Sequence, residues 1–518
     1  MKFFIYGPPG SGKSTIGRRL ADDLGRLFVD LDQQIEERAG MSIPEIFAGS
    51  GEAVFRKLET EMLEKVCSAS HPAGVVALGG GALLSAENRE LVEKSGIVVC
   101  LRATIGTLSK RLERDHIQRP LLGGNARQKL AGLLGAREQH YASFTRVLDV
   151  ENVLPEELSR QIQIMSGNYH VAGMGQAYDV LIGSGGLSDL GVFLRTRGLD
   201  RPAVLVTDKN VGEHYSGPVL ETLRAAGIRA SEIRIEPGES NKHIETIVWM
   251  WESFAGAGLD RNGLIIALGG GVVGDMAGFA AATFLRGVDW VNIPTSLLAM
   301  VDSSLGGKTG ANLSKGKNLI GAFHAPRLVV ADPDVLATLP EGEWRAGMAE
   351  TFKHGVISDP LLFDWCGQGL PEIKQRAEAV VRRAAAVKAW VITQDPYERG
   401  PRKVLNLGHT VGHGVELASG YRVSHGEAVA IGMVIETRFA ERCGICQQGY
   451  SERLKKTLSM LELPTEIPAD LNRVEIIRGM KMDKKRADGK VLFAISTGIG
   501  EAIPAVELAN WEKMLLEV

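Results

Sequence analysis

The chain has 518 residues, of which 44% are hydrophobic and 23% are charged, and its formal net charge is -3. It is too long for one hydrophobic core, and its composition is typical of a soluble globular protein with two to four domains. The absence of a basic excess argues against nucleic acid and membrane partners, and no apolar run approaches the roughly 18 residues of a membrane span. We therefore expect small-molecule partners.

Residues 1–165 alternate between short apolar runs and helical patterns. Strands are predicted at 2–6, 74–78 and 97–101, and helices at 14–24, 51–67 and 156–164. Such alternation predicts a parallel sheet with helices on both faces. The first strand runs almost directly from the N-terminus, which leaves no room for a signal or transit peptide, so a cytoplasmic location is expected.

A phosphate-binding loop follows the first strand. Residues 7–14 read GPPGSGKS, the G-x-x-x-x-G-K-[ST] pattern, between a predicted strand and a predicted helix. Backbone N–H groups of such a loop surround phosphate oxygens, while Lys13 would reach the β- and γ-phosphates and Ser14 would bind Mg²⁺. The pattern therefore predicts a nucleoside triphosphate and Mg²⁺ as ligands.

Charged residues downstream are candidates for binding the molecule that is phosphorylated. Asp30 and Asp32 follow the apolar run 27–29, so we expect their side chains to share one face of a strand end. Arg56, Arg119 and Arg137 are candidate clamps, because a guanidinium matches a carboxylate or phosphate.

A second pattern begins near residue 168. A hairpin is predicted over 168–182, followed by buried strands at 204–207, 263–268, 290–293 and 328–331. After about residue 335 strands nearly vanish, and long helical stretches such as 371–392 and 425–443 follow. Three domains are expected: a P-loop domain at 1–165, a Rossmann-like α/β domain at 168–335 and a mostly helical domain at 336–518.

A glycine turn follows the strand at 263–268. Residues 269–274 match G-x-G-x-x-G, but the pattern is weak alone. Asp289 stands at the spacing of the acid that a dinucleotide fingerprint requires, yet it adjoins a predicted strand. We interpret Asp289 as a surface turn residue.

The helical part contains candidate metal ligands. His409 and His413 are four residues apart and share a face if their segment is helical, and His425 and Glu350 could complete a site. The spacing leaves open which two of the three histidines bind.

Several cations lie in apolar or glycine-rich surroundings nearby. They predict a substrate with more than one anionic group. These cations are Arg286, Lys308, Lys317, Lys353, Lys388 and Arg402.

The five cysteines are too few and irregular for a disulfide framework. Cys443 and Cys446 form a C-x-x-C pair without the second pair that a zinc ribbon requires. We interpret them as two packed thiols in a helical region.

Residues 1 to about 160 resemble shikimate kinase of the P-loop kinase superfamily, through GPPGSGKST, FVDLD, FRKLE, ALGGGA and QRPLL in that order. The resemblance implies that Lys13, Asp32 and Arg119 are catalytic, with Arg119 on a lid at about 113–124. It further implies that shikimate contacts Asp32, Arg56, Gly80 and Arg137, and that ATP and Mg²⁺ contact Gly10, Ser11, Gly12, Lys13, Ser14, Thr15, Asp30 and Arg119.

Residues from about 168 onward resemble 3-dehydroquinate synthase, through PGESNK, GGGVVGDMAGFAAATFLRG, VDSSLGGKTGAN, KGKNLIGAF, AETFKHG, LNLGHTVGH and SHGEAVA. The resemblance implies Zn²⁺ or Co²⁺ on Glu350, His409 and His425, with His413 handling protons near the substrate phosphate. It implies that Lys308, Lys353, His413 and Arg286 are catalytic, Arg286 coming from a second subunit of a homodimer.

The same resemblance implies two further sets of contacts. The sugar phosphate would be bound by Arg286, Lys308, Asn318, Lys353, Lys388, Arg402, Asn406 and His413. NAD would be bound by Asp208, Pro237, Gly238, Glu239, Ser240, Asn241, Lys242, Gly271, Val272, Val273, Gly274, Asp275, Thr295, Ser296, Lys308, Lys317, Val335, Leu336, Ala337 and Thr338.

The implied reaction oxidises a substrate hydroxyl with NAD⁺, eliminates phosphate, reduces the ketone again and closes a ring without net redox change.

A polyol dehydrogenase of the same superfamily is an alternative, but its uncharged substrates would not require the cations. A sister sugar-phosphate cyclase should differ at Arg402 and Asn406, which are present. An inactive binding module should lack Lys13, Asp32, Glu350 or His425, and all four are present. We expect a bifunctional enzyme of aromatic-compound biosynthesis.

Overall fold

The computed structural model describes residues 2–68, 71, 73–114, 126–314, 316–484 and 490–518. The chain divides into two compact units, Met1–Ser166 and Gly167–Val518, each considered by itself. No helix among the described residues is both long and apolar enough to cross a membrane.

Unit 1 is built on a parallel sheet. The strands have the order β2-β3-β1-β4-β5 in the described residues. Their bounds are β1 Lys2–Tyr6, β2 Leu27–Asp30, β3 Ala73–Ala77, β4 Gly96–Arg102 and β5 Val147–Asp149. The predicted strands at 2–6, 74–78 and 97–101 are confirmed to within a residue or so.

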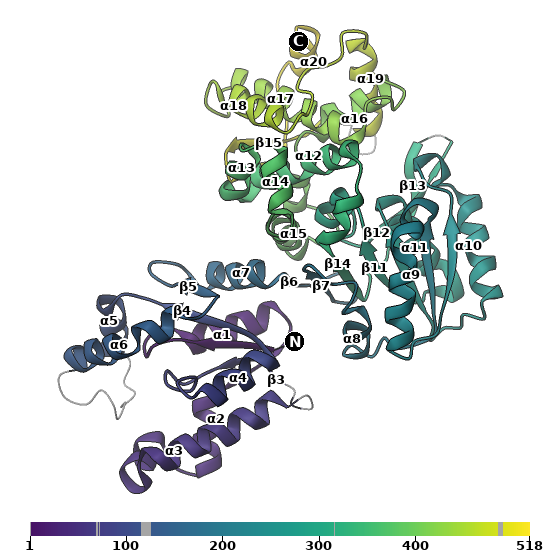
Figure 1. The fold of residues 1–518 in the computed structure, drawn as a ribbon. Helices are drawn as coiled ribbons and strands as arrows, with labels where there is room; N and C mark the ends of the chain where they lie inside the picture. The colour runs from purple at the N-terminus through teal and green to yellow at the C-terminus, as the bar shows by residue number, and fades with distance from the viewer. Residues whose placement is uncertain (1, 69–70, 72, 115–125, 315, 485–489) are drawn as a thin grey trace. The chain divides into compact units, whose positions relative to one another are not determined.

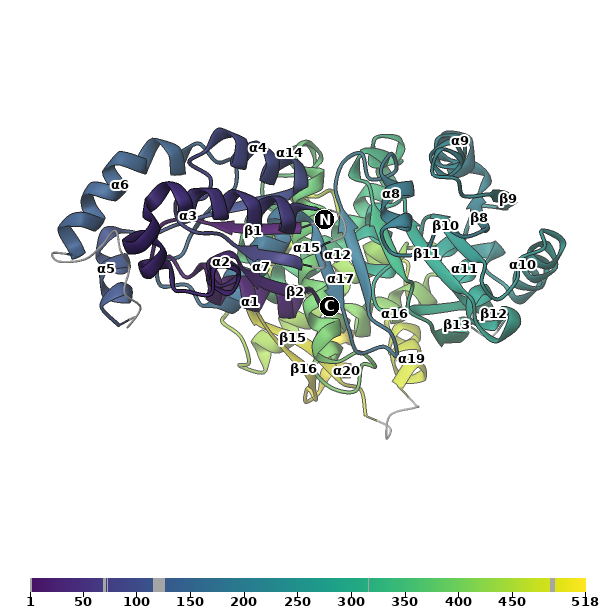
Figure 2. The same ribbon diagram turned by 90° about the horizontal axis from the view of Figure 1, so that it is seen from below.

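Helices cover both faces of this sheet, as predicted (Figures 1 and 2). Alternate strand residues point to opposite sides, so Phe4 and Val76 pack with α2, α3 and α4, while Phe3 and Val75 pack with α1 and α7. The helices are α1 Lys13–Asp23, α2 Leu31–Ala39, α3 Ile43–Cys67, α4 Ala86–Ser95, α5 Ile105–Arg114, α6 Ala126–Ala142 and α7 Pro155–Ser166. The predicted helix at 51–67 is the second part of α3, which is kinked at Gly51.

Unit 2 begins with a larger sheet of order β6-β7-β14-β11-β10-β8-β9. The pair β6–β7 is the predicted antiparallel hairpin, and the remaining pairs are parallel. The bounds are β6 Asn168–Val171, β7 Tyr178–Ile182, β8 Ala203–Asp208, β9 Ala230–Ile235, β10 Leu264–Gly269, β11 Asp289–Pro294 and β14 Leu328–Ala331. β9 lies on one side of β8 and β10 on the other, so the direction of winding reverses between β8 and β10.

Helices α8 Leu190–Arg195, α9 Lys209–Ala225, α10 Ile244–Gly256 and α11 Gly271–Thr283 accompany this sheet. Val206 and Ala267 pack against α10 and α11, and α9 lies on the other face (Figure 2). A separate antiparallel hairpin, β12 Lys308–Leu313 and β13 Gly316–Phe323, packs on α11.

The rest of unit 2 is mostly helical, as predicted. The helices are α12 Glu341–Ser358, α13 Pro360–Cys366, α14 Leu370–Gln375, α15 Ala377–Gln394, α16 His409–Ala418, α17 His425–Arg442, α18 Tyr450–Met460, α19 Arg473–Lys484 and α20 Trp511–Leu516. Short helical turns at Phe284–Arg286, Ala299–Ser303, Pro333–Thr338 and Pro401–Asn406 connect elements around the sheet and helices.

Three details of this part differ from the sequence-based expectations. A late hairpin forms from β15 Phe493–Gly498 and β16 Glu501–Val506, because Phe493 and Ile495 complete the core under α16 and α17. The helix predicted over 371–392 is broken at Arg376, which has non-helical backbone angles. Cys443 is exposed rather than packed, and burial raises the pKa of the Cys446 thiol to about 11.

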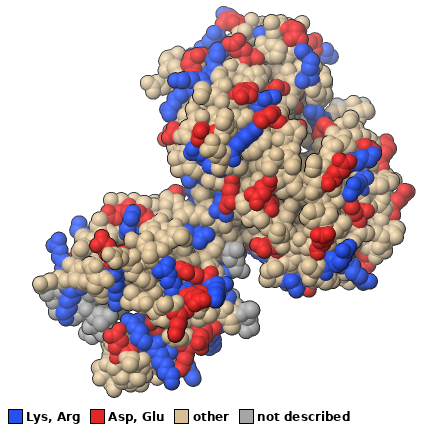
Figure 3. Space-filling view, in the orientation of Figure 1, with Lys and Arg blue, Asp and Glu red and all other residues tan. Residues whose placement is uncertain are grey.

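Positive and negative side chains are interspersed over the face drawn in Figure 3. This mixture matches the small net charge of the sequence.

Candidate functional site

The phosphate loop of unit 1 connects β1 to α1. Gly10 and Gly12 have φ of 79° and 88°, backbone angles that favour glycine, and Gly12 begins the helix. Nζ of Lys13 donates hydrogen bonds to the carbonyls of Gly7 at 3.0 Å and Pro8 at 3.1 Å. The ammonium therefore lies over the loop, where the phosphates of a nucleotide would bind.

Two aspartates lie beside this loop, in an arrangement that differs from the prediction. Asp30 ends β2, but Asp32 is in the first turn of α2, so the two do not share a strand face. Asp30 caps α2 by accepting from the backbone N–H of Asp32 at 3.2 Å, and its other oxygen accepts from Oγ of Ser14 at 2.6 Å. This pairing places a carboxylate next to the hydroxyl expected to bind Mg²⁺.

The glycine run after β3 brings the other predicted kinase residues together. The carbonyl of Gly80 accepts from Nη1 of Arg137 at 3.1 Å and from the Tyr141 hydroxyl at 2.8 Å. A Cβ on Gly79 would lie 2.9 Å from Oδ1 of Asp32, and one on Gly81 would lie 2.9 Å from Nη2 of Arg56. Only glycine permits this close approach.

Arg56 is held by two glutamates, Glu59 at 2.7 Å and Glu52 at 3.1 Å. Glu59 is buried, and burial raises the pKa of its carboxyl although Arg56 opposes the change. Ser11 and Thr15 belong to the loop and the start of α1, and the Oγ of Ser11 is buried. Arg119 and most of the predicted lid at 113–124 lie outside the described residues.

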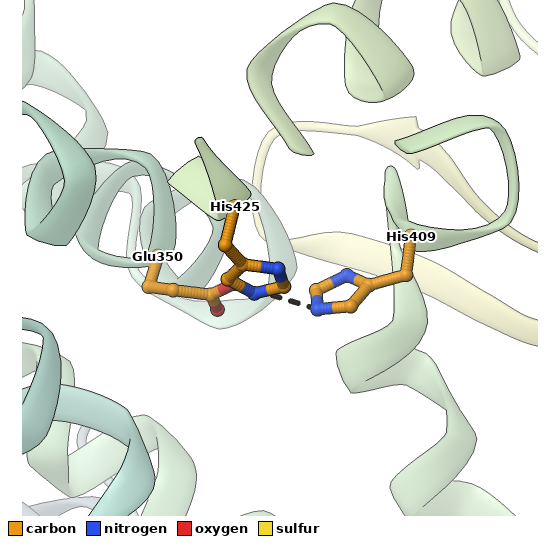
Figure 4. Close-up of side chains that lie close together, drawn as sticks. All are labelled: Glu350, His409 and His425. Atoms are coloured by element: carbon orange, nitrogen blue, oxygen red, sulfur yellow. Dashed lines mark ion pairs between the residues drawn. The ribbon is translucent and has the colours of Figure 1, made fainter. Parts of the chain in front are cut away.

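In unit 2, three helices bring Glu350, His409 and His425 together (Figure 4). Oε1 of Glu350 lies 3.5 Å from Nε2 of His409 and 3.6 Å from Nε2 of His425. Glu350 is fully buried; its Oε2 contacts the ammonium of Lys353, and its Oε1 makes no hydrogen bond with any described residue. A buried carboxylate oxygen without a hydrogen bond, placed between two imidazole nitrogens, fits a divalent metal ion.

The second nitrogen of each histidine is also held. Nδ1 of His409 lies 3.1 Å from the carbonyl of Leu407, and Nδ1 of His425 lies 3.3 Å from Oε2 of Glu416. When Nδ1 of His409 and of His425 carries the proton, the lone pair on Nε2 of each ring points toward Glu350.

The electrostatics of the cluster also suit a metal. Burial and the Lys353 charge keep the pKa of His409 well below its usual value, so its ring is neutral. Burial alone would lower the pKa of His425, but Glu350 and Glu416 outweigh it and raise this pKa to about 10. A metal ion would replace the proton on Nε2 of His425.

The segment that contains His409 and His413 is helical, so helix α16 places both histidines and Glu416 on one side. The His413 ring lies 5.4 Å from that of His409 and 6.3 Å from that of His425. Ligand atoms of His413, Glu416 and His425 also lie within 4.8 Å of one another, so geometry permits a second combination.

Among the cations predicted from sequence, Lys308, Lys353 and Lys388 have an acidic partner, and Lys353 and Lys388 are buried. Lys353 contacts Glu350, and Nζ of Lys388 lies 2.6 Å from Oδ1 of Asp302. Lys308 contacts Glu398, whose other oxygen accepts from Nδ2 of Asn406 at 2.9 Å. Arg402 is buried and donates to the carbonyl of Pro396.

The residues predicted to bind NAD lie at the carboxyl ends of adjacent strands. Asp208 ends β8, the turn at 269–271 ends β10, and Thr295 and Ser296 follow β11. The winding of the sheet reverses between β8 and β10, the position where open parallel sheets bind ligands. The remaining predicted contacts are the segment 237–242 after β9, residues 272–275 in the first turns of α11, Lys308 and Lys317 in the β12–β13 hairpin, and the short helix Pro333–Thr338 after β14.

Polar contacts fix the turn between β10 and α11. Lys242 is buried and its Nζ lies 2.6 Å from Oδ2 of Asp275 and 2.7 Å from Oδ1 of Asn318. Asn318 has φ of 52°, and its backbone N–H donates to Oδ1 of Asn312 at 2.8 Å. A Cβ on Gly271 would lie 3.0 Å from Oγ of Ser303, and one on Gly274 would lie 3.1 Å from the Asn292 amide.

Two predicted residues stand apart. Arg286 is exposed, and no hydrogen bond or ion pair among the described residues joins it to the cluster. Asp289 is not a turn residue: it begins β11 and pairs with Arg201 at 2.6 Å.

The residues of the site that the sequence did not reveal are mostly carboxylates, namely Asp302, Glu398, Glu416 and Glu436. Glu436 is buried and caps α16 by accepting from the backbone N–H groups of Gly408 and Val411. The available signal was the number of cations in apolar or glycine-rich surroundings, because a cation removed from water requires a counter-charge.

Family models match most of the chain. Residues 232–346 match 3-dehydroquinate synthase N-terminal, and 347–486 match 3-dehydroquinate synthase C-terminal. The 3-dehydroquinate synthase of Geobacter metallireducens is 46% identical over 333 residues, covering 63% of this chain and 91% of that relative. The chain belongs to the 3-dehydroquinate synthase family. The enzyme of Synechocystis is 44% identical over 331 residues, covering 62% of this chain and 92% of the relative.

Residues 9–165 match the shikimate kinase family, so the chain is a bifunctional fusion of shikimate kinase and 3-dehydroquinate synthase domains.

Two solved structures resemble unit 2. A 2-deoxy-scyllo-inosose synthase in complex with carbaglucose-6-phosphate, NAD⁺ and Co²⁺ is 25% identical, with a TM-score of 0.62 over 67% of this chain and 98% of the other. A 2-epi-5-epi-valiolone synthase from Streptomyces hygroscopicus with NAD⁺ and Zn²⁺ is 26% identical, with a TM-score of 0.60 over 66% and 95%.

Proposed function

We propose that unit 1 transfers the γ-phosphoryl group of ATP to the 3-hydroxyl of shikimate. We further propose that unit 2 converts 3-deoxy-D-arabino-heptulosonate 7-phosphate to 3-dehydroquinate with phosphate elimination. The observation that carries the second activity is the Glu350 carboxylate facing two histidine nitrogens beside Lys353.

In unit 1, Lys13 would contact the ATP phosphates, and Ser14 with Asp30 would organise Mg²⁺. Asp32 would accept the proton of the attacking hydroxyl. Arg56 and Arg137 lie on either side of the glycine run and suit the substrate carboxylate.

In unit 2, Glu350, His409 and His425 would hold Zn²⁺ or Co²⁺. A divalent metal there would polarise substrate oxygens. The residues fit because Oε1 of the buried Glu350 accepts no hydrogen bond from a described residue and each Nδ1 is already held by another acceptor.

NAD⁺ would bind at the carboxyl ends of β8, β10 and β11, and it would supply the hydride acceptor. The ion pair of the buried Lys242 with Asp275 supports this proposal by fixing the first turn of α11 at the point where the sheet winding reverses.

The cations of unit 2 would bind the two anionic ends of the sugar phosphate. Lys308, Lys353 and Lys388 come from three elements, and Arg402 with Asn406 lies on the turn before α16. Their acidic partners keep them oriented without substrate. A held phosphate would remain beside His413, where it can take up the proton of its own elimination.

A homodimer would complete the site. Arg286 is exposed and separate from the cluster in its own chain, which supports its contribution to a second copy. Mixing the inactive variants Arg286→Ala and His425→Ala should restore part of the synthase activity, because a mixed dimer contains one intact site. No recovery after confirmed subunit exchange would contradict a shared site.

The cysteines support a cytoplasmic location. All five, each within the described residues, are free thiols. Free thiols persist where the compartment is reducing.

The two activities can be tested on one purified protein. Phosphate release would be measured from the heptulosonate phosphate with NAD⁺ and Zn²⁺, and ADP formation from shikimate with ATP and Mg²⁺. Lys13→Ala should abolish only the kinase, and His425→Ala only the synthase. Loss of both activities in either folded variant would contradict independent sites.

A further inference from the structure

Glu416 lies next to the candidate metal site without being one of its proposed ligands. It is three residues after His413 and seven after His409 on α16, so all three lie on one side of the helix. Its side chain is only 8% exposed. A carboxylate in such a position needs partners that offset the loss of hydration.

The two oxygens of Glu416 bind different elements. Oε2 lies 3.3 Å from Nδ1 of His425, at the start of α17. Oε1 lies 3.4 Å from Nζ of Lys317, on strand β13. Glu416 thereby joins the two helices that carry the histidines to the hairpin that packs on α11.

His425 is held at both ring nitrogens. Its Nε2 faces Oε1 of Glu350 at 3.6 Å, while its Nδ1 faces Glu416 (Figure 4 shows the Glu350 side). An imidazole bound to a metal through one nitrogen usually donates the other N–H to a carboxylate or carbonyl, which fixes the ring. The corresponding partner of His409 is the neutral carbonyl of Leu407.

Glu416 could instead be a ligand of an ion placed between His413 and His425. The hydrogen bonds argue against this role, because both oxygens of Glu416 already accept from His425 and Lys317. In Glu350 only Oε2 is engaged, by Lys353, while Oε1 accepts no hydrogen bond from a described residue and faces Nε2 of both His409 and His425. The ion should therefore bind at Oε1 of Glu350, with Glu416 outside it.

Lys317 keeps the Glu416 carboxylate in place. Its ammonium also lies 4.1 Å from the ring centre of Tyr421, in the loop between α16 and α17. The next residue, Asn318, accepts from Lys242, which pairs with Asp275 in α11. Polar contacts thus extend from the glycine turn to the metal cluster.

We propose that Glu416 is a positioning residue of the metal site, which orients His425 through Nδ1 and is itself held by Lys317. This inference rests on the proposed metal site of unit 2. In this proposal Glu416 does not contact the substrate, and it acts on the metal site through His425.

The test is Co²⁺ binding to the metal-free full-length protein, followed by visible absorption and by competition with a chelator. Loss of an outer partner of this type weakens metal binding by about 10–100-fold. We expect Glu416→Ala to show the largest loss, Glu416→Gln a smaller loss because its amide oxygen still accepts from Nδ1, and Lys317→Met the smallest. The Co²⁺ absorption bands should shift in Glu416→Ala.

Glu427→Gln is the matched control. Glu427 is a carboxylate near the start of α17, the helix that carries His425, where it binds the backbone and hydroxyl of Ser424, and glutamine also suits this capping position. This variant should bind Co²⁺ like the unaltered protein. Thermal unfolding of each variant checks that unit 2 remains folded.

Three results would overturn the inference: unchanged Co²⁺ affinity and spectrum in Glu416→Ala, an equal loss in Glu427→Gln, or two ions per chain with one lost in Glu416→Ala. The last would make Glu416 a ligand. If instead unaltered protein binds no Co²⁺, or His409→Ala binds it normally, the proposed metal site itself is wrong.

Discussion

Nζ of Lys388 on α15 lies 2.6 Å from Oδ1 of Asp302 and also donates to the Asp302 backbone carbonyl at 2.7 Å. Lys388 is buried, and its charge holds the pKa of Asp302 at about 2 although burial alone would raise it. The pair joins the helical part of unit 2 to the turn Ala299–Ser303, which follows β11 of the sheet.

Breaking this pair should destabilise unit 2. Lys388→Gln leaves the Asp302 carboxylate without its counter-charge; because the Asp302 side chain is 24% exposed, we expect a loss below the roughly 3 kcal/mol of a fully buried pair. The double variant Lys388→Gln with Asp302→Asn should recover part of the loss. Denaturant unfolding measures both, and additive losses in the double variant would show that the pair is not coupled.

Gly81→Ala should weaken shikimate binding. Its Cβ would lie 2.9 Å from Nη2 of Arg56, which is anchored to Glu59 and Glu52, so the guanidinium must move. We expect KM for shikimate to rise about tenfold, the equivalent of one charge-assisted hydrogen bond. KM for ATP should change little. The control is Gly135→Ala in α6, where a Cβ meets no atom within 4 Å; an equal rise there would contradict the steric explanation.

The stability of unit 2 should fall in mild acid through His354. Burial, assisted by Lys353, lowers the pKa of His354 to about 3 from 6.5. Between these values the unfolded chain binds one more proton than the folded chain, so stability is lost as pH falls below 6.5, by about 1.4 kcal/mol per pH unit. His354→Leu should remove this contribution. Thermal unfolding from pH 8 to 5 measures it, and parallel curves for the two proteins would refute the assignment.

Chelation should separate the two activities. Metal-free protein should lose synthase activity, regain it with Zn²⁺ or Co²⁺, and keep kinase activity once Mg²⁺ is restored. Unit 2 should stay folded, because Lys353 contacts Glu350 and compensates its charge. Circular dichroism with both assays tests this, and unfolding on chelation would show a structural metal instead.

Metal affinity should also fall as pH falls. Glu350 and Glu416 raise the pKa of His425 to about 10, so a proton competes with the ion for Nε2 throughout the neutral range. Each unit decrease in pH should weaken Co²⁺ binding by up to about tenfold. Titration between pH 6.5 and 8.5 measures this slope, and a flat profile would show that His425 is already neutral.

Local features could be predicted from spacing along the chain. The phosphate loop, most strands of the two parallel sheets and the four-residue interval between His409 and His413 follow from spacing within a few residues. Backbone geometry makes such spacing informative, since side chains repeat every two residues in a strand and every 3.6 in a helix.

Which distant residues meet depends on the folding of the whole chain. The fold places Asp32 on a helix and the Gly79–Gly81 run against Asp32 and Arg56, and it pairs Lys388, Lys308 and Lys317 with Asp302, Glu398 and Glu416. It also directed Nε2 of both His409 and His425 toward Glu350. No periodicity encodes these contacts, because they depend on how separate helices and strands pack, and packing sets the burial that makes each charge require a partner.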